Sequence, residues 1–393
     1  MARLASVAFT HYDSDPRVRR MAEALAERGD DVTAIALKTA GFPRKRQVAG
    51  VNVVGVPIPR YRGRSNAAYA ALYGGFFTAA TAILSAMHRR RPFDVIHVNN
   101  MPDFIVFAGF PAKRRGAKVL LDLHDPMPEL YASKFSRGEN HPAVRLVTAV
   151  ERASVSFADR VITVNEVMRD AFVRHGNPKD AFTVIENAAD TRRFPVGAAL
   201  GRQRSGSDVV RIVYHGTMTP RLGLDVALHA IKEVTDAGTA VSLALIGDGN
   251  DAPRLTGLVV ELGLEEIVDL QIGYVPVEEL LPHLIDADIG IVPAHAGAFT
   301  NTMVPSKLLE YVTLGIPSIC SDLPAVRHYF DSDQVTFVKP GDAVALAEAI
   351  AALAHDPGRR RRQAERAMAS LNRHNWATER QRYLDLIDEL AEA

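Results

Sequence analysis

The chain has 393 residues, of which 47% are hydrophobic and 23% are charged, and its formal net charge at pH 7 is zero. This composition is typical of a globular protein long enough for two domains, and the zero net charge argues against a general nucleic-acid-binding protein. Having a single cysteine, Cys320, excludes an intrachain disulfide. Its place in the apolar run IPSIC predicts a core residue rather than a nucleophile.

Charge and hydropathy are uneven along the chain. Residues 1–100 contain 15 Lys and Arg against 7 Asp and Glu, which suggests an anionic partner such as a lipid phosphate. The start MARLASVAFTHY lacks the long apolar region of a signal peptide, and no later run reaches membrane-spanning length cleanly. The expected location is therefore the cytoplasm.

Short apolar strands alternate with helical stretches, from LASVAF and DVTAIAL near the start to DIGIVP and IPSIC near the end. This alternation predicts an α/β fold with parallel sheets covered by helices on both faces. Residues 196–208, rich in Gly, Ser and Arg, predict a linker. Two α/β halves joined in this way predict a cleft at the carboxyl ends of both sheets, where ligands usually bind.

The segment after the first strand, DSDPRVRRMAEALAERG, predicts a helix that ends before Gly29. Asp15 is a suitable N-cap and Pro16 suits the first turn. Asp13 and Asp15 also form a D-x-D pair of the kind that can hold a metal ion. Capping is the favoured interpretation because the pair lies where a helix must begin, so no metal site is predicted.

Three arginines, Arg17, Arg19 and Arg20, follow in the first turns of this helix. Near the expected cleft they could meet a phosphate of a substrate, since guanidinium groups bind phosphate well. A solvated helix face is the equally weighted alternative. The residues alone leave both interpretations open.

Residues 67–87 are rich in alanine and aromatic side chains and predict a packed helix, because Gly, Thr and Ser make the stretch weakly hydrophobic. Arginines flank it, and a second interpretation therefore places it on an anionic membrane surface. The flanking residues are Arg60, Arg62, Arg64, Arg89, Arg90 and Arg91.

Two predicted strands, DVIHV and AKVLLDL, carry or precede the histidines His97 and His124. A polar, proline-containing loop, HDPMPEL, begins at His124, so this histidine is the better candidate for a ligand-facing group. Asp125 and Glu129 are weaker candidates in the same loop. A structural role is the common alternative for a lone histidine.

The second half opens with VVRIVYHGTMTPRLGLD, a predicted strand, a turn of small residues and a helix. In this geometry the amides of Gly216 and Thr217 are expected to face a pyrophosphate, and Arg221 to add positive charge. The following VSLALIGDGNDA matches the dinucleotide pattern G-x-G-x-x-A from Gly247, which raises a dehydrogenase as an alternative. That match is weak, because the pattern belongs after the first strand of a nucleotide domain.

The stretch NTMVPSKLLEYVTLGIPSIC predicts a helix over residues 304–314, with Thr302 as cap, Pro305 in the first turn and Gly315 at the end. Helical winding puts one polar set on a free face and one apolar set on a packed face. Amides at the helix start suit phosphate oxygens, and a carboxylate suits a ribose diol. The free face holds Ser306, Lys307, Glu310 and Thr313; the packed face holds Val304, Leu308, Tyr311 and Val312.

A surface ion pair between Lys307 and Glu310, worth about 0.2–0.5 kcal/mol, is the alternative use of these two side chains. No carboxylate pair at convincing glycosidase spacing can be read from the sequence.

Taken in order, these motifs resemble those of the family-4 retaining nucleotide-sugar glycosyltransferases, which have the two-domain GT-B fold. The likeness is to a subgroup with HDxMPE and P-x-K-L-x-E-Y, here HDPMPE and PSKLLEY. It implies that Glu310 binds the donor ribose and that His124 lies near the donor sugar's hydroxyls. Thr302 stands where the common family pattern has a first glutamate.

The resemblance extends to other parts of the site. The IGDG-like turn at Gly247 is implied to lie on the phosphate side, and the GYVP-like loop implies that Tyr274 and Val275 contact the base, with an exposed turn as the alternative. Asp15, Arg17, Arg19 and Asp125 are expected on the acceptor or phosphate side. The implied domains are 1–195 for the acceptor side, 196–208 as linker, 209–372 for the nucleotide sugar, and a helix at 373–393 that crosses back to the first domain.

The implied function is transfer of a glycosyl unit from a nucleoside-diphosphate sugar, such as a UDP-sugar, to a hydroxyl of a glycan, lipid-linked or small-molecule acceptor. Bacterial glycan or glycoconjugate synthesis is the implied setting. Retention of configuration is implied, with neither cofactor nor metal. A nucleotide-sugar 2-epimerase of the same fold and a non-catalytic nucleotide-sugar-binding protein are the alternatives. The base, the sugar and the acceptor are not specified by the residues.

Overall fold

The computed structural model describes the whole chain except residues 60, 62, 64, 136, 139, 201–208 and 393. It contains two compact units, Met1–Asn187 with Ala377–Ala393 (unit 1) and Ala188–Trp376 (unit 2). The sequence placed the first boundary after residue 195, and the structure places it after Asn187. Arg60, Arg62 and Arg64, predicted to flank a helix, lie outside the described residues, as does 201–208 of the predicted linker.

Residues 196–200 of that predicted linker are bound to unit 2. The Gly197 amide donates to the Thr313 carbonyl at 2.9 Å, and the Ala199 amide donates to the Leu314 carbonyl at 2.8 Å. Both carbonyls belong to the last turn of a helix, where they have no partner within the helix. This segment therefore supplies hydrogen-bond donors to the last carbonyl groups of that helix and does not behave as a free linker.

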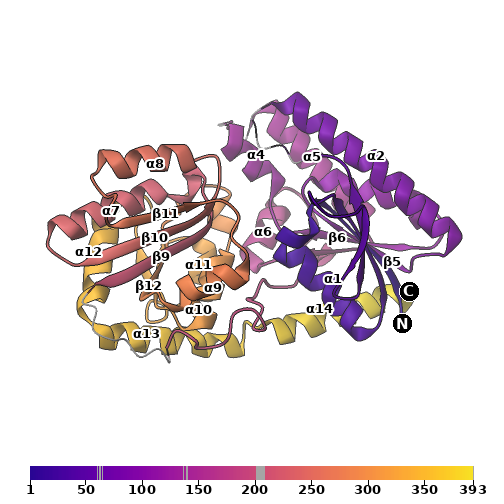
Figure 1. Cartoon of the computed structure of the whole chain (residues 1–393). Coiled ribbons are helices and arrows are strands. Elements are labelled where there is room, and N and C mark those ends of the chain that lie inside the picture. The colour runs from indigo at the N-terminus through magenta and orange to yellow at the C-terminus, as the bar shows by residue number, and fades with distance from the viewer. Residues whose placement is uncertain are drawn as a thin grey trace. The chain divides into compact units, whose positions relative to one another are not determined.

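Unit 1 is built on an eight-stranded sheet in the order β3-β4-β2-β1-β5-β6-β7-β8. Figure 1 shows this sheet, with β5 and β6 labelled. All of its neighbouring strands run parallel except β3 and β4, which pair antiparallel at one edge. The strands are β1 (Arg3–His11), β2 (Asp31–Leu37), β3 (Lys45–Val48), β4 (Val51–Val56), β5 (Val95–Asn99), β6 (Lys118–Leu123), β7 (Arg160–Thr163) and β8 (Phe182–Val184).

The unit 1 helices pack on this sheet, and its last helix comes from the far end of the chain. The Tyr383 hydroxyl, in that helix, lies 2.9 Å from Nδ1 of His97 in β5. The helical elements are η1 (Tyr12–Ser14), α1 (Pro16–Arg28), α2 (Asn66–Arg90), η2 (Asp103–Gly109), α3 (Phe110–Lys113), α4 (Met127–Phe135), α5 (Pro142–Phe157), α6 (Glu166–Arg174), η3 (Lys179–Ala181) and α14 (Trp376–Glu392).

Helix α2 packs with one stripe of its surface. Phe76, Ala80 and Leu84, spaced four residues apart, are fully buried in the unit 1 core, as expected for one face of a helix. By length and composition α2 is also the one described helix that could cross a membrane, yet only 17% of its most apolar window is buried. The packed-helix prediction therefore holds for one face, while much of the remaining surface is exposed alanine.

Unit 2 has a six-stranded parallel sheet in the order β11-β10-β9-β12-β13-β14. Its elements are β9 (Val210–Thr217), η4 (Pro220–Leu222), α7 (Leu224–Asp236), β10 (Val241–Asp248), α8 (Ala252–Glu261), β11 (Val268–Ile272), α9 (Val277–Ile285), β12 (Ile289–Val292), η5 (Thr300–Thr302), α10 (Ser306–Leu314), β13 (Ser318–Ser321), α11 (Pro324–Tyr329), β14 (Thr336–Val338), α12 (Ala343–His355), α13 (Pro357–Ala369) and η6 (Ser370–Asn372).

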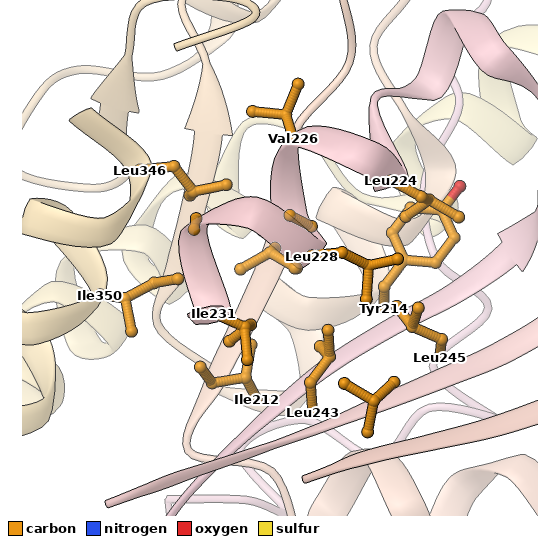
Figure 2. Close-up of a cluster of buried hydrophobic side chains, with 14 of the residues drawn as sticks. Ile212, Tyr214, Leu224, Val226, Leu228, Ile231, Leu243, Leu245, Leu346 and Ile350 are labelled. Carbon is orange, nitrogen blue, oxygen red and sulfur yellow. The ribbon is translucent and has the colours of Figure 1, made fainter. Parts of the chain in front are cut away.

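Two hydrophobic clusters cover the two faces of this sheet. Ile212 and Tyr214 of β9 belong to the cluster under α7, α8 and α12, and Figure 2 shows them with side chains of α7, β10 and α12. Val213, between them in sequence, belongs to the cluster under α9, α10 and α11. Successive strand residues point to opposite faces, so helices on both sides explain why these strands read as continuous apolar runs. The prediction of two parallel-sheet α/β domains is confirmed.

Candidate active site

Asp122, the next-to-last residue of β6, is the charged centre of the unit 1 site. It is fully buried, and Arg17 donates to it through Nε at 2.8 Å and Nη2 at 3.0 Å. Burial would raise the pKa of this carboxyl, but Arg17, His124 and His97 hold it well below its usual value. Asp122 is therefore a fixed anion beneath the end of the sheet, held by a two-pronged arginine contact.

Arg17 does not lie on a solvated face, which was one of the two predicted settings. Its side chain is 8% exposed, and Nη1 donates to Oδ1 of Asn187 at 2.9 Å. Arg20 is likewise buried, whereas the neighbouring Arg19 forms a part-buried ion pair with Glu23. Because the guanidinium of Arg17 already binds Asp122, a phosphate would have to compete with that carboxylate.

His124 follows β6 and lies beside Asp122. Its Nδ1 is 3.6 Å from Oδ1 of Asp122, and its side chain remains 17% exposed. Burial lowers the pKa of His124, but the Asp122 carboxylate outweighs this and leaves the pKa above its usual value. His97, by contrast, is 2% exposed and contacts Tyr383. The structure thus distinguishes a partly exposed, readily protonated histidine from a buried one.

The other predicted unit 1 residues have local partners. Asp15 caps α1 by accepting a hydrogen bond from the Val18 amide at 3.2 Å, which agrees with the capping interpretation. Asp13 accepts from Thr39 at 2.8 Å and pairs with Arg46. The Asp125 carbonyl accepts from Nδ2 of Asn100 at 2.6 Å. Among the described residues, no group of three or more His, Cys, Asp or Glu side chains is arranged to hold a metal ion.

In unit 2, glycine residues allow the ends of β9 and β10 to approach each other closely. Gly216 and Thr217 are the last residues of β9 and pair with Gly247 and Asp248 of β10. A side chain on Gly247 would lie 1.8 Å from the Gly216 carbonyl oxygen, and its φ of +153° also disfavours other residues. The prediction placed Gly216 and Thr217 in a turn after the strand; the strand instead continues through both, and both are exposed.

Helix α10 presents Glu310 beside the end of β9. Oε2 of Glu310 lies 2.5 Å from Nε2 of His215, and Nδ1 of His215 lies 3.1 Å from the Tyr311 hydroxyl. The Tyr311 hydroxyl donates to the Val213 carbonyl at 3.3 Å. The Glu310 side chain is 14% exposed, and within the described residues its second oxygen makes no hydrogen bond. One carboxylate oxygen is therefore anchored, and the other is available to a ligand.

Lys307 lies next to this group but does not pair with Glu310 in the described part of the chain. Its Nζ is 4.6 Å from the centre of the Tyr214 ring, a favourable cation–π distance. A side chain built on Gly216 would meet the Lys307 Cε at 3.5 Å, so the ammonium group borders the glycine strand end. The alternative of a surface ion pair between Lys307 and Glu310 is therefore not found among the described residues, and Lys307 is only 9% exposed.

Fewer residues are exposed on the polar face of α10 than the sequence predicted. Thr313 is buried and donates to the Leu309 carbonyl at 2.8 Å, whereas Ser306, the first helical residue, is exposed. Thr302 is not the cap, because its hydroxyl donates to the Phe299 carbonyl at 2.8 Å in a separate turn. Pro305 occupies the N-cap position instead.

The remaining predicted residues of unit 2 lie in a short 3-10 helix and a loop. Arg221, in η4, places its guanidinium 5.1 Å from the centre of the Phe299 ring. Tyr274, just after β11, is 69% exposed, and Val275 packs against the cluster under α9 and α10. Tyr274 therefore has the geometry of an exposed turn residue, free to contact a ligand.

A separate cavity of about 410 Å³ is found on one face of the unit 2 sheet. It is lined by residues near the amino ends of the strands, such as Arg211 and Ser242, and by His283 and Asp286 of the α9 region. Glu310 and the glycine strand ends lie toward the carboxyl ends. The cavity is thus distinct from the candidate site.

Like Asp122 in unit 1, His215 is a site residue that the sequence reasoning missed. It is 6% exposed and joins the end of β9 to Glu310 and Tyr311. The signal available in the sequence was a histidine directly before Gly216 at the end of an apolar strand. Its partners lie 95 and 96 positions further along the chain, so only the fold brings the three together.

Two family models match this chain. One, described as "Glycosyl transferase 4-like domain", covers residues 14–188, and the other, "Glycosyl transferases group 1", covers residues 202–369. Asp122 and His124 lie in the first range, and His215, Lys307 and Glu310 lie in the second.

Two curated relatives give the same assignment. The putative colanic acid biosynthesis glycosyltransferase WcaL of Escherichia coli K12 is 26% identical over 199 residues, which are 49% of this chain and 47% of that protein. The match thus spans about half the length of that relative. The 2-deoxystreptamine glucosyltransferase of Streptomyces kanamyceticus is 24% identical over 358 residues, 87% of this chain and 89% of that protein.

A solved structure supports the fold. That of Anabaena HepE in complex with UDP-glucose aligns with a TM-score of 0.72 at 15% identity, covering 99% of this chain and 100% of that one. This likeness shows the fold, and the two family models with the curated relatives show that the chain belongs to the family-4 type of glycosyltransferases, which have the GT-B fold.

Proposed function

We propose that this protein transfers a glycosyl unit from a nucleoside-diphosphate sugar to an acceptor hydroxyl, with unit 2 binding the donor and unit 1 supplying His124. The observation that carries the proposal is the geometry of Glu310. Its carboxylate is anchored at one oxygen by His215 and open at the other, and it lies beside exposed glycine backbone and the Lys307 ammonium group. A ribose diol and a diphosphate need this combination of acceptor and positive charge.

The chemical demand of the reaction is to stabilise the departing diphosphate. Lys307, Arg221 and the amides at the start of α10 near Ser306 can meet that charge, and one such preorganised donor is typically worth about 3–4 kcal/mol. Gly216 and Gly247 supply backbone that a ligand can approach closely because no side chain intervenes, and Thr217 directly follows Gly216. We infer transfer without a metal ion on this basis, and retention of configuration from the family resemblance.

His124 is proposed to orient the donor sugar. It carries an exposed ring edge, and the buried Asp122 anion favours its protonated form, which donates hydrogen bonds from both ring nitrogens. The acceptor or phosphate side is proposed to include Asp125, Asp15, Arg17 and Arg19. Asp15 and Arg17 already have partners within unit 1, so a ligand would have to compete with those contacts.

The nucleotide and acceptor to test first follow from the relatives. UDP-glucose is the ligand named for HepE, and Tyr274 is exposed enough to contact a base. One relative is named for a polysaccharide and another for a small aminocyclitol, so both a glycan and a small molecule belong in the acceptor screen.

We propose a cytoplasmic location and a peripheral contact with anionic lipid. The buried single cysteine suits a reducing compartment. The loop between β2 and β3 exposes Phe42, 48% accessible, beside Lys38, Arg44 and Lys45, a combination that suits an anionic surface. Flotation with vesicles containing an anionic lipid tests this; protein that stays unbound at low salt contradicts it.

The test of the main proposal begins with a screen of nucleotide sugars for thermal stabilisation, because a ligand at 100 times its dissociation constant adds about 2.7 kcal/mol. Each hit is then incubated with and without acceptors, and free nucleoside diphosphate is measured. Release that requires an acceptor supports transfer. A new sugar epimer with donor alone would indicate an epimerase, and binding without any release would indicate a non-catalytic protein.

The Glu310→Ala variant is expected to bind the donor about 10- to 100-fold more weakly, because hydrogen bonds to a charged group contribute about 1.5–3 kcal/mol. Calorimetry measures the change. Unaltered donor affinity in this variant would remove Glu310 from the binding site.

A further inference from the structure

A buried ionic cluster connects three helices of unit 1 behind the His124 loop. His175, which follows α6, has Nδ1 3.0 Å from both carboxylate oxygens of Glu151 in α5. Its Nε2 lies 3.0 Å from Oε1 of Glu129 in α4. Glu151 is fully buried, and the side chains of Glu129 and His175 are 12% and 17% exposed. We call these three residues the His175 cluster.

The hydrogen-bond geometry favours a charged histidine. A neutral imidazole carries one N–H, and an ionised carboxylate has no hydrogen to donate. Both ring nitrogens lie within hydrogen-bond distance of carboxylate oxygens, and an imidazolium can donate to both. Burial lowers the pKa of His175, but the two carboxylates outweigh it and raise the pKa to about 10. Burial raises the pKa of Glu151, and the contacts with His175 and Asn177 act against this. With both carboxylates ionised, the cluster holds one positive and two negative charges.

Glu129 is not needed to neutralise the buried pair. Glu151 already receives His175 and, at 2.8 Å, the side-chain amide of Asn177. Adding a second, nearly buried carboxylate leaves an excess negative charge in a place where burying charge is costly. What Glu129 adds is a connection from the α5–α6 pair to α4.

That connection reaches the candidate active site directly. Helix α4 begins at Met127, three positions after His124, and Glu129 lies in its first turn. On the other side, Asn100 holds the same segment: Oδ1 accepts from the His124 amide at 3.2 Å, and Nδ2 donates to the Asp125 carbonyl at 2.6 Å. Asp103 in turn accepts from Asn100 at 3.0 Å. The segment 124–129 is therefore held at both ends.

We propose that Glu129 is a positioning residue, which acts through His175 to fix α4 and thereby the orientation of His124 during turnover. The inference rests on the proposed function, because it assigns His124 to the reaction. It assigns no contact between Glu129 and the substrate.

The experiment compares Glu129→Ala with Glu129→Gln in the full chain. The alanine variant removes the ion pair from His175 to α4 but keeps the His175–Glu151 pair and the packing of α4 on α5, so the fold should persist. The glutamine variant keeps an oxygen that accepts from Nε2. Glu166→Ala is the matched control, because Glu166 also forms an ion pair, with Arg169, but at the surface of α6.

We expect Glu129→Ala to lower kcat at least tenfold with donor affinity and melting temperature close to those of the wild type. Glu129→Gln should retain most of the turnover, and Glu166→Ala all of it. A kcat for Glu129→Ala within twofold of the wild type would overturn the inference. So would a joint loss of melting temperature, donor affinity and kcat, which would indicate a contribution to stability alone.

A second readout separates this inference from the proposed function. The ring resonance of His124, followed by NMR, should shift in Glu129→Ala and stay in place in Glu166→Ala whether or not an acceptor is known. If the two variants differ in this way but the wild-type protein transfers no sugar, the proposed function is refuted and the positioning role stands. An unmoved His124 resonance would refute the positioning role itself.

Discussion

His215 determines where the Glu310 carboxylate lies, because the ring is buried and contacts both Glu310 and Tyr311. Burial raises the pKa of Tyr311 well above its ordinary value, so this residue keeps its proton and remains a hydrogen-bond donor. The chain of contacts from the Val213 carbonyl through Tyr311 and His215 ends at Glu310. The orientation of Glu310 is thus set by β9 as well as by its own helix.

Replacing His215 by alanine should weaken donor binding about tenfold, because a hydrogen bond to a charged group contributes about 1.5 kcal/mol or more. His215→Gln, which can still donate to Glu310, should lose less. Calorimetric titration with the donor found by screening measures both. His283→Ala, which removes an exposed histidine of the same unit, is the control, and equal affinities for it and His215→Ala would contradict the assignment.

The His175 cluster should make the free energy of unfolding decrease as the pH becomes alkaline. The folded-state pKa of His175, about 10, is above its ordinary value of 6.5, so its stabilising contribution is complete below about pH 6.5 and is lost as the pH rises toward 10. The urea midpoint should therefore fall between pH 7 and pH 9.5. The fall should be smaller in Glu129→Gln, in which one of the two charges that raise this pKa is absent; an equal fall in both proteins would argue against the cluster.

At the level of single residues, the sequence was informative about roles that depend on neighbours along the chain. The Asp15 cap and the buried Cys320 depend on neighbours along the chain, and both are found. His215 was missed, and the ion pair of Arg17 was not predicted, because their partners, Glu310 and Asp122, come from distant helices and strands. No local pattern indicates that an arginine in a first helical turn will be buried by a carboxylate 105 positions away.

Among the elements, helix α10 shows how proline determines a boundary. The sequence predicted a helix from residue 304, and the structure starts it at Ser306. Val304 precedes Pro305, and the residue before a proline is disfavoured in the helical region. Pro305 itself is extended, with ψ at 128°. The end of the helix was predicted more closely, because Gly315 adopts the left-handed conformation that closes many helices.

The contact between the ends of β9 and β10 predicts a large effect of one methyl group. Gly247→Ala should destabilise unit 2 by more than the roughly 1–3 kcal/mol typical of a strained backbone residue, because its side chain would overlap the Gly216 carbonyl. Gly257→Ala is the matched control: Gly257 lies inside α8 with nothing within 4 Å of an added side chain. Alanine there should be neutral or stabilising by up to about 1 kcal/mol.

Thermal unfolding of the two variants measures this difference. A Gly247→Ala protein as stable as the wild type would show that the two strand ends can separate without cost. Donor affinity of the same variant reports whether the close approach matters for binding as well.

In the molecule as a whole, unit 1 depends on a helix supplied from the end of unit 2. Tyr383 and Ile387 of α14 are fully buried, and Leu384 and Leu390 nearly so. Arg28 of α1 also pairs with Asp388. The parallel sheets and the existence of two α/β units followed from the alternation of strands and helices. The strand order was not predicted, and the unit boundaries were not either, because residues 196–200 have a linker composition but are bound to α10.

Removing residues 377–393 should unfold or loosen unit 1 while unit 2 retains its fold. Calorimetry should show the loss of one transition, and limited proteolysis should cut within residues 1–187 first. Tyr383→Phe serves as the control, because it removes only the hydroxyl near His97 and should cost about 1 kcal/mol. An unchanged proteolysis pattern after the deletion would show that unit 1 is stable without α14.

Unit 1 is built from two separate parts of the chain, and this sets the order in which the ribosome makes its elements. A ribosome releases the first 187 residues, then all of unit 2, and only then the residues of α14. At roughly 5–20 residues per second, the nascent amino-terminal sheet waits about 10–40 s for its covering helix. During that interval its uncovered apolar surface is available to chaperones, so yield in a heterologous host should respond to translation speed more than to the stability of the finished protein.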